Sequence, residues 1–218
     1  AFGIDALFLE NAESRITLIK APGVGGVNAG VALAFALERY KIDAVILTGV
    51  AGALTHELDI GDFVVAANVV QHDSIYSGHT DHSFDLMAPG ELYLQKTHDT
   101  EFTNPVIATD AGLTAWLVDQ LQSGVHQTII GGMTSGGEFV ANISRKKTLS
   151  ALPNKPLTVD MEAASVAQIC RRQKVRFSVI KTVADRLNPD GSIASDYATF
   201  LPLAAQRAGR LIEVLVRT

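Results

Sequence analysis

Short hydrophobic runs alternate with longer amphipathic stretches along the chain. Continuous apolar runs bounded by turn residues predict buried strands at 43–49, 61–70, 126–133 and 176–185, with shorter strands at 7–9, 16–19 and 157–159. Stretches with helical spacing of Ala, Leu and Val predict helices at 28–40, 110–121, 144–152, 162–172 and 195–216. Asp110 is expected to cap the second of these helices. Residues 72–90 mix His, Asp, Ser and Gly and predict a long loop.

Regular alternation of strands and helices implies a mostly parallel or mixed central sheet flanked by helices. The length of 218 residues fits one α/β domain, which we expect to span 1–218. Because 47% of the residues are hydrophobic and 19% are charged, the chain can bury a sizeable core.

Charge and cysteine content narrow the classes of partner. The net charge of −5 argues against nucleic acid and anionic membranes, since nothing would offset phosphate repulsion. No uninterrupted apolar run is long enough to cross a bilayer. Cys170 is the only cysteine, so no intrachain disulfide forms, and its helical setting predicts a buried residue instead of a nucleophile.

Candidate chemistry gathers where predicted strands end. In open α/β sheets, ligands bind outside the carboxyl ends of the strands. Five stretches follow strands in this way: GVGG at 23–26, GVAG at 49–52, 135–139, 160–162 and Asp185. We therefore expect the functional site at this edge of the sheet.

These stretches, in this order, resemble the nucleoside phosphorylase and nucleosidase superfamily, and most closely the methylthioadenosine/S-adenosylhomocysteine nucleosidases. The motifs are TGVAGAL at 48–54, TSGGEFVAN at 134–142, VDMEAASVAQIC at 159–170 and VIKTVAD at 179–185. The resemblance covers nearly the whole chain. It implies hydrolysis of adenine nucleosides with 5′-thio substituents, releasing adenine, in a cytoplasmic homodimer that needs no cofactor or metal.

Cleavage of a purine N-glycosidic bond needs a proton donor near N7 of the leaving base. Asp185 ends a strand, where burial favours a protonated carboxyl. Position alone is equally compatible with a cap on the following segment, and the resemblance favours the catalytic acid. A carboxylate with only acceptor sites suits the ribose hydroxyls, and Glu162 takes that role, although a helix N-terminus also favours an acidic residue.

The resemblance assigns further contacts to the substrate. Met161 would lie beneath the sugar, Phe139 would stack on adenine, and Val140 would read the base edge through its backbone; core packing is the plain alternative for Met161 and Phe139. The family often has an acid at the position of Asp160, and the resemblance leaves open whether its role here is functional or structural. The remaining assignments are Ala51 and Gly52 in the glycine turn, and Tyr197 with Phe200 as an aromatic lid.

The nucleophile is expected to be water. Related phosphorylases carry Arg and Ser where this chain has Leu47 and Val50, which cannot bind phosphate, and Arg15 alone is poor provision for a doubly charged anion. A phosphate-dependent purine nucleoside phosphorylase and a non-catalytic nucleoside-binding or storage relative remain the alternatives. Val50 also replaces the small hydroxyl residue usual in the nucleosidases.

The resembling nucleosidases begin with a strand and a segment whose Glu activates the water. This chain starts at AFGIDALFLEN, which resembles their second strand, so we expect that first segment to be missing or separately represented. Glu138 and Glu10 are unsupported substitutes for this base.

The predicted loop holds six side chains of types that commonly bind metals, but their spacing matches no tight metal-binding motif. They are His72, Asp73, His79, Asp81, His82 and Asp85.

Overall fold

The protein is described by a computed structural model over residues 4–10, 15–77, 84–86, 104–121, 126–188 and 192–195, together with positions 202, 206, 209, 212 and 213. Within these ranges the chain forms a mixed α/β fold, in agreement with the sequence prediction.

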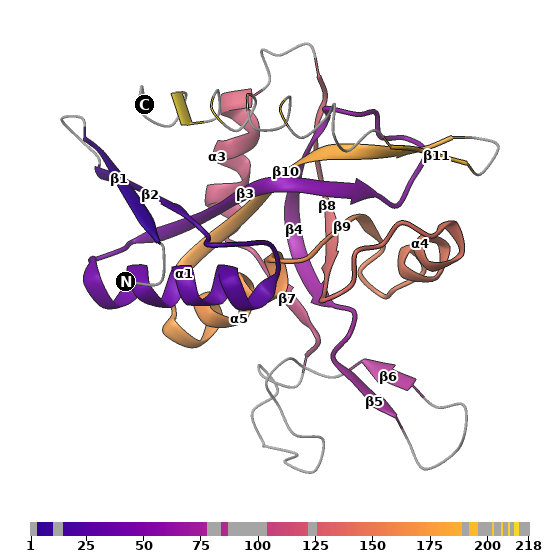
Figure 1. The fold of residues 1–218 in the computed structure, drawn as a ribbon, viewed down its shortest axis with the longest axis horizontal. Coiled ribbons are helices and arrows are strands. Elements are labelled where there is room, and N and C mark those ends of the chain that lie inside the picture. Colours follow the sequence, from indigo (N-terminus) through magenta and orange to yellow (C-terminus); the bar gives the residue numbers. More distant parts are fainter. Residues whose placement is uncertain are drawn as a thin grey trace.

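A central seven-stranded sheet organises the molecule (Figure 1). Its strands, in chain order, are β3 (Ala44–Ala53), β4 (Phe63–Gln71), β7 (Val106–Ala108), β8 (Thr128–Ser135), β9 (Pro156–Asp160), β10 (Arg176–Leu187) and β11 (Ile193–Ser195). Their order across the sheet is β11-β10-β3-β9-β8-β4-β7, and β10 also pairs with β4. This extra pairing closes β10, β3, β9, β8 and β4 into a ring. Parallel pairs join β10 to β3, β4 to β8 and β8 to β9, and the other pairings are antiparallel.

Four described helices cover the sheet, and they form where helical spacing of apolar residues predicts them. They are α1 (Gly26–Arg39), α3 (Ala111–Leu121), α4 (Ile143–Ser150) and α5 (Ala163–Gln173). Figure 1 shows α1 and α5 side by side, with α3 on the opposite side of the sheet. The Asp110 carboxylate accepts the N–H of Leu113 (2.8 Å), so the predicted cap of α3 is confirmed.

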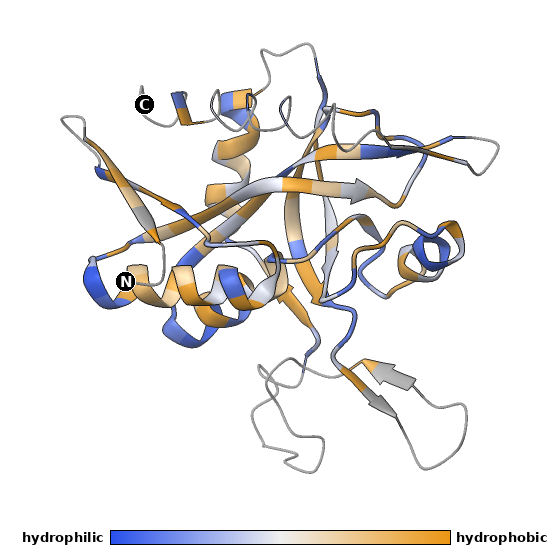
Figure 2. Cartoon of the chain, in the orientation of Figure 1, coloured by the Kyte–Doolittle hydropathy of each residue, from blue (hydrophilic) through white to orange (hydrophobic). Residues whose placement is uncertain are grey.

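The main core lies between the sheet and the α1–α5 pair. It joins apolar residues of β3, β4, β8 and β10 to the inward face of α5, including Ala163, Val166, Ala167 and Cys170. A second cluster under α3 joins Leu117 to Val65 and Ile180. Hydrophobic residues accordingly follow the strands, while hydrophilic residues gather on α4 and at one end of α5 (Figure 2). No described helix is both long and apolar enough to cross a membrane.

Several short elements differ from the sequence prediction. The strands at 7–9 and 16–19 are confirmed as the hairpin β1 (Asp5–Glu10) and β2 (Arg15–Lys20). The predicted loop at 72–90 instead contains a second hairpin, β5 (Ile75–Ser77) and β6 (Phe84–Leu86). β7 was not predicted, because a three-residue strand is too short for its periodicity to be recognised. The predicted closing helix starts too early, since Ser195 belongs to β11; the described positions from 202 to 213 are helical.

Candidate active site

The site is arranged around β10, which carries Lys181 and Asp185. β10 runs parallel to β3, and its register with β3 shifts between Val183 and Asp185. A bulge of this kind re-aims the side chains that follow it. After the shift, Asp185 lies opposite Gly52, at the end of β3 where the sequence predicted a ligand-binding turn.

The Asp185 carboxylate is held from two sides. The N–H of Ala53 donates to Oδ1 (2.8 Å), and the Lys146 ammonium on α4 donates to Oδ1 and Oδ2 (2.6 and 2.7 Å). Lys146 also donates to the carbonyl of Ala53 (3.0 Å). The Lys146 side chain is 0% exposed, whereas that of Asp185 is 17% exposed, so the aspartate alone can meet a ligand from outside.

Gly52 allows this close approach between β3 and the carboxylate. A Cβ atom at position 52 would lie 2.9 Å from Oδ2 of Asp185 and 3.2 Å from Nζ of Lys146. Any side chain there would push against the ion pair. Gly52 and Asp185 are therefore brought together as predicted, with Ala51 buried in the strand just before them.

Glu162 forms a second centre at the start of α5. Its Oε1 accepts the N–H of Gly25 (2.8 Å), and its Oε2 accepts from the Lys181 ammonium (3.1 Å). Gly25 has φ of 97°, a conformation that favours glycine, and this residue precedes α1. Glu162 therefore links the α1 turn to β10, while its side chain stays 19% exposed.

Asp160 has a structural role, one of the two that the sequence left open. Both of its oxygens accept the N–H of Ala163 (3.2 and 3.1 Å), so it satisfies the first backbone donor of α5. It also pairs with Lys181 (2.7 Å) at 0% side-chain exposure. Burial opposes the charge on Lys181, but the carboxylates of Asp160 and Glu162 outweigh it and raise its pKa.

The predicted base-binding segment is anchored next to Asp185. Val140 is buried against three apolar side chains. They are Leu54 just after β3, Leu149 on α4 and Val159 in β9. Phe139, the neighbouring residue, is 66% exposed. The segment thus presents an aromatic ring at the surface while its next residue is fixed in the core.

His72 supports this segment from the end of β4. Its ring lies against Gly136, and Asp73 accepts the N–H of Gly137 (2.6 Å). Burial is the main cause of the lowered pKa of His72. Nε2 is buried without a hydrogen-bond partner among the described residues. His72 and Asp73 therefore fix the glycine turn at 136–137.

Other predicted candidates do not join the site. Glu138 accepts a hydrogen bond from Nε of Arg145 (2.8 Å), and Leu47 packs against the main core. Tyr197, Phe200, His79, Asp81 and His82 lie outside the described residues, as do the side chains of Glu10 and Asp85. Across the described ranges, no group of three or more His, Cys, Asp or Glu side chains is placed to hold a metal ion.

Sequence reasoning missed Lys146 and Lys181. Lys181 did carry a signal, because a lysine between Ile180 and Thr182 in an apolar strand must find a partner when buried. Lys146 gave none, since it stands between Arg145 and Lys147 on a short helix where solvent exposure is the ordinary expectation.

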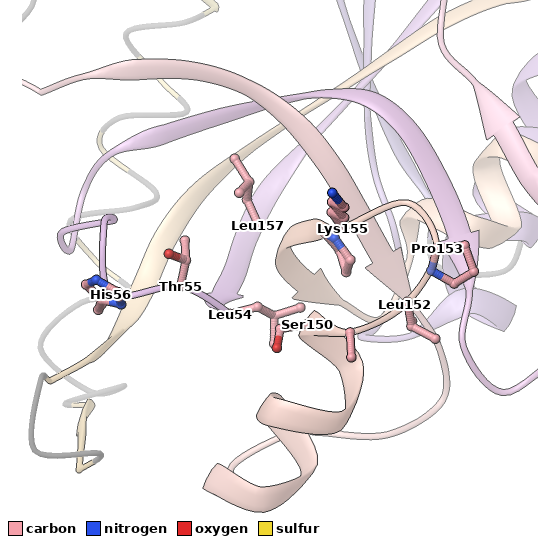
Figure 3. Close-up of a pocket in the computed structure, with 10 residues that line it drawn as sticks. Leu54, Thr55, His56, Ser150, Leu152, Pro153, Lys155 and Leu157 are labelled. Atoms are coloured by element: carbon pink, nitrogen blue, oxygen red, sulfur yellow. The ribbon is translucent and has the colours of Figure 1, made fainter.

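An open hollow of about 530 Å³ lies next to Leu54, the residue that follows Ala53. It is bounded by residues 54–56 and by residues 150–157, between the end of β3 and the connection from α4 to β9 (Figure 3). None of the predicted substrate-binding side chains lines it. The chemistry of the Asp185 and Glu162 centres, not the size of this hollow, identifies the candidate site.

Comparisons with known proteins agree with the geometry. A model of the phosphorylase superfamily matches residues 7–217. A 5′-methylthioadenosine/S-adenosylhomocysteine nucleosidase of Staphylococcus aureus is 29% identical over 209 residues, covering 94% of this chain and 82% of the relative. The sequence-based resemblance is thereby confirmed.

Solved structures share the fold. The same kind of nucleosidase from Neisseria meningitidis, in complex with methylthio-immucillin-A, has a TM-score of 0.75 at 24% identity, covering 99% of this chain and 90% of that one. Native futalosine hydrolase of Helicobacter pylori has a TM-score of 0.74 at 23% identity, covering 99% and 89%.

Proposed function

Because the chain belongs to the phosphorylase superfamily, we propose that it is an N-glycosyl hydrolase that cleaves methylthioadenosine and S-adenosylhomocysteine to adenine and the thioribose sugar. The observation that carries this proposal is the pairing of two carboxylate centres through one strand. Asp185 lies on β10, and Glu162 is bonded to Lys181 of the same strand. The attachment of both carboxylates to one strand supports the proposal that Asp185 is the proton donor and Glu162 the sugar-binding acceptor.

The proposed reaction separates charge between the sugar and the base. As the bond from C1′ to N9 breaks, its electrons move to the purine, and Asp185 protonates N7. Glu162 accepts hydrogen bonds from the 2′- and 3′-hydroxyls, with Met161 beneath the sugar. Phe139 stacks on adenine, an aromatic contact that its exposure permits, and the Val140 backbone reads the base edge.

The remaining assignments complete the pocket. Ala51 and Gly52 form the wall at the end of β3, and Tyr197 is proposed to cover the 5′ substituent. The whole of 1–218 is proposed to act as one domain.

Water is the proposed nucleophile. Phosphate binding calls for several unneutralised cationic donors. Lys146 is paired with Asp185, and Lys181 is paired with Asp160 and Glu162, so the cations described at this site already serve carboxylates. Leu47 and Val50 occupy β3 where the phosphorylases carry an arginine and a serine.

An adenine-release assay tests the proposal. The full-length protein is mixed with methylthioadenosine in phosphate-free buffer, and adenine is followed by chromatography. We expect release without phosphate, and a loss of about 100-fold or more in Asp185→Asn because a general acid contributes this much. Asp43→Asn, at an exposed position, is the matched control and should keep full activity. Release only after phosphate is added would make the protein a phosphorylase; no release in either buffer would favour the non-catalytic alternative.

We also propose a homodimer, located in the cytoplasm and serving methionine salvage. Supporting the dimer, Val24, Val27 and Val31 expose 67%, 82% and 38% of their surface around the start of α1. These valines flank Gly25, whose N–H contacts Glu162. A partner covering them would lie next to the sugar-binding centre.

A further inference from the structure

Asp185, the proposed acid, is paired with the buried side chain of Lys146. The ammonium of Lys146 has three N–H donors, and all three are used: two on the oxygens of Asp185 and one on the carbonyl of Ala53. Nothing of its side chain reaches solvent. Its only charged partner in the described structure is the carboxylate proposed to protonate the base.

Helix α4 holds the Lys146 side chain in place. Asn142 caps α4 by accepting the N–H of Arg145 (3.1 Å). Lys146 and Leu149, three residues apart on one face, are the buried residues of α4, and Leu149 packs with Val140 of the base-binding segment. The same face therefore anchors the base-binding segment and places an ammonium on Asp185.

Stability gives a weak reason for such a pair. Burying two charges costs desolvation energy, and well-packed apolar replacements for buried ion pairs are often neutral or stabilising. A chemical reason is stronger, because Asp185 must hold a proton when the purine departs, and both of its oxygens accept hydrogen bonds from Lys146.

We propose that Lys146 is a positioning and proton-supplying residue for Asp185, so that the Lys146–Asp185 pair acts together as the acid. This inference rests on the proposed nucleosidase function. As the electrons of the C1′–N9 bond pass to the purine, Lys146 Nζ gives a proton to the Asp185 carboxylate and becomes a neutral amine, and the resulting Asp185 carboxyl passes that proton to N7. Water adds its hydroxyl to C1′, and the proton it releases restores the ammonium, so atoms and charge balance.

Leaving groups of different basicity separate this role from a structural one. The first substrate is methylthioadenosine, whose base requires protonation. The second is a 5′-methylthioriboside of 4-nitrophenol, whose leaving group departs as a stable anion without a proton. Lys146→Met is compared with Lys147→Met, an identical change at the adjacent exposed lysine. Both variants are checked by circular dichroism and thermal melting.

We expect Lys146→Met to lose about 100-fold or more in kcat on methylthioadenosine, with KM little changed, and to cleave the nitrophenyl riboside within about threefold of wild type. Lys147→Met should match wild type on both substrates. Equal losses on both substrates in Lys146→Met would show a structural role and overturn the inference, as would full activity on methylthioadenosine. A wild-type protein inactive on methylthioadenosine would instead refute the proposed function, and the inference with it.

Discussion

At the scale of single residues, two lysines removed from water organise the candidate site. Lys146 and Lys181 have side chains 0% and 1% exposed, and each is paired with one carboxylate that keeps some contact with the outside, Asp185 for Lys146 and Glu162 for Lys181. The acidic partners are visible in the sequence because they follow predicted strands. The pairing of the lysines with them is not, because it joins distant chain segments that sequence spacing does not reveal; the apolar strand around Lys181 signals burial, whereas the polar neighbours of Lys146 do not.

Lys181→Met is expected to destabilise the fold by about 3–5 kcal/mol, since it leaves the fully buried Asp160 carboxylate without its cation. The free energy of unfolding, measured by urea denaturation, checks this. Lys41→Met, at an exposed position, is the control and should change stability little.

The pH dependence of this stabilisation follows from the raised pKa of Lys181. A raised pKa in the folded state means that the contribution is fully present below the ordinary value of 10.5 and is lost as the pH rises through the folded value. Wild type should therefore lose stability above about pH 10.5, and Lys181→Met should show less of this alkaline loss. A variant as stable as wild type at pH 7 would contradict the prediction.

At the scale of elements, the loop between α4 and β9 is locked against β8. Asn154 donates its side-chain amide to the Met133 carbonyl (3.0 Å) and to the side chain of Asn68 (3.1 Å). A Cβ atom at Gly132 would meet the backbone oxygen of Asn154 well inside van der Waals contact.

Long, strongly periodic elements such as α1, α5 and β10 were predicted to within a few residues. The three-residue strands were not, since pairing partners define them more than their own sequence does.

Gly132→Ala is expected to cost about 1–3 kcal/mol, because the loop backbone must move away from β8. Gly30→Ala, inside α1, is the matched control: its new Cβ would meet only Ile169 Cδ1, at 3.5 Å. That change should stabilise the protein by about 0.5–1 kcal/mol, the usual gain of alanine over glycine in a helix. Thermal melts of both variants measure the contrast, and equal shifts in the same direction would refute it.

At the scale of the whole molecule, five strands close into a ring, and Val24, Val27 and Val31 around the start of α1 stay exposed. The α/β class and the place of the site at strand ends followed from the alternation of elements. The ring did not, because the β10–β4 pairing joins strands more than a hundred residues apart, and no local pattern specifies it.

Val27→Asp is expected to convert the proposed dimer to monomers, because a charge would be buried at the interface. Sedimentation velocity of the full-length protein reports the molecular mass. Val27→Ala keeps an apolar surface and should remain dimeric. A monomeric wild type would remove the basis of the assembly proposal, and a Val27→Asp dimer would place the interface elsewhere.

Because Lys181 and Asp185 both lie on β10, that strand fixes the distance between the Glu162 and Asp185 centres. Because of the bulge, Lys181 and Asp185 lie opposite Gly49 and Gly52 of β3, which are three residues apart, and at about 3.3 Å per residue this sets a spacing of roughly 10 Å between the two anchors. We therefore expect the substrates that the proposed site accepts to differ only in groups beyond the nucleoside core.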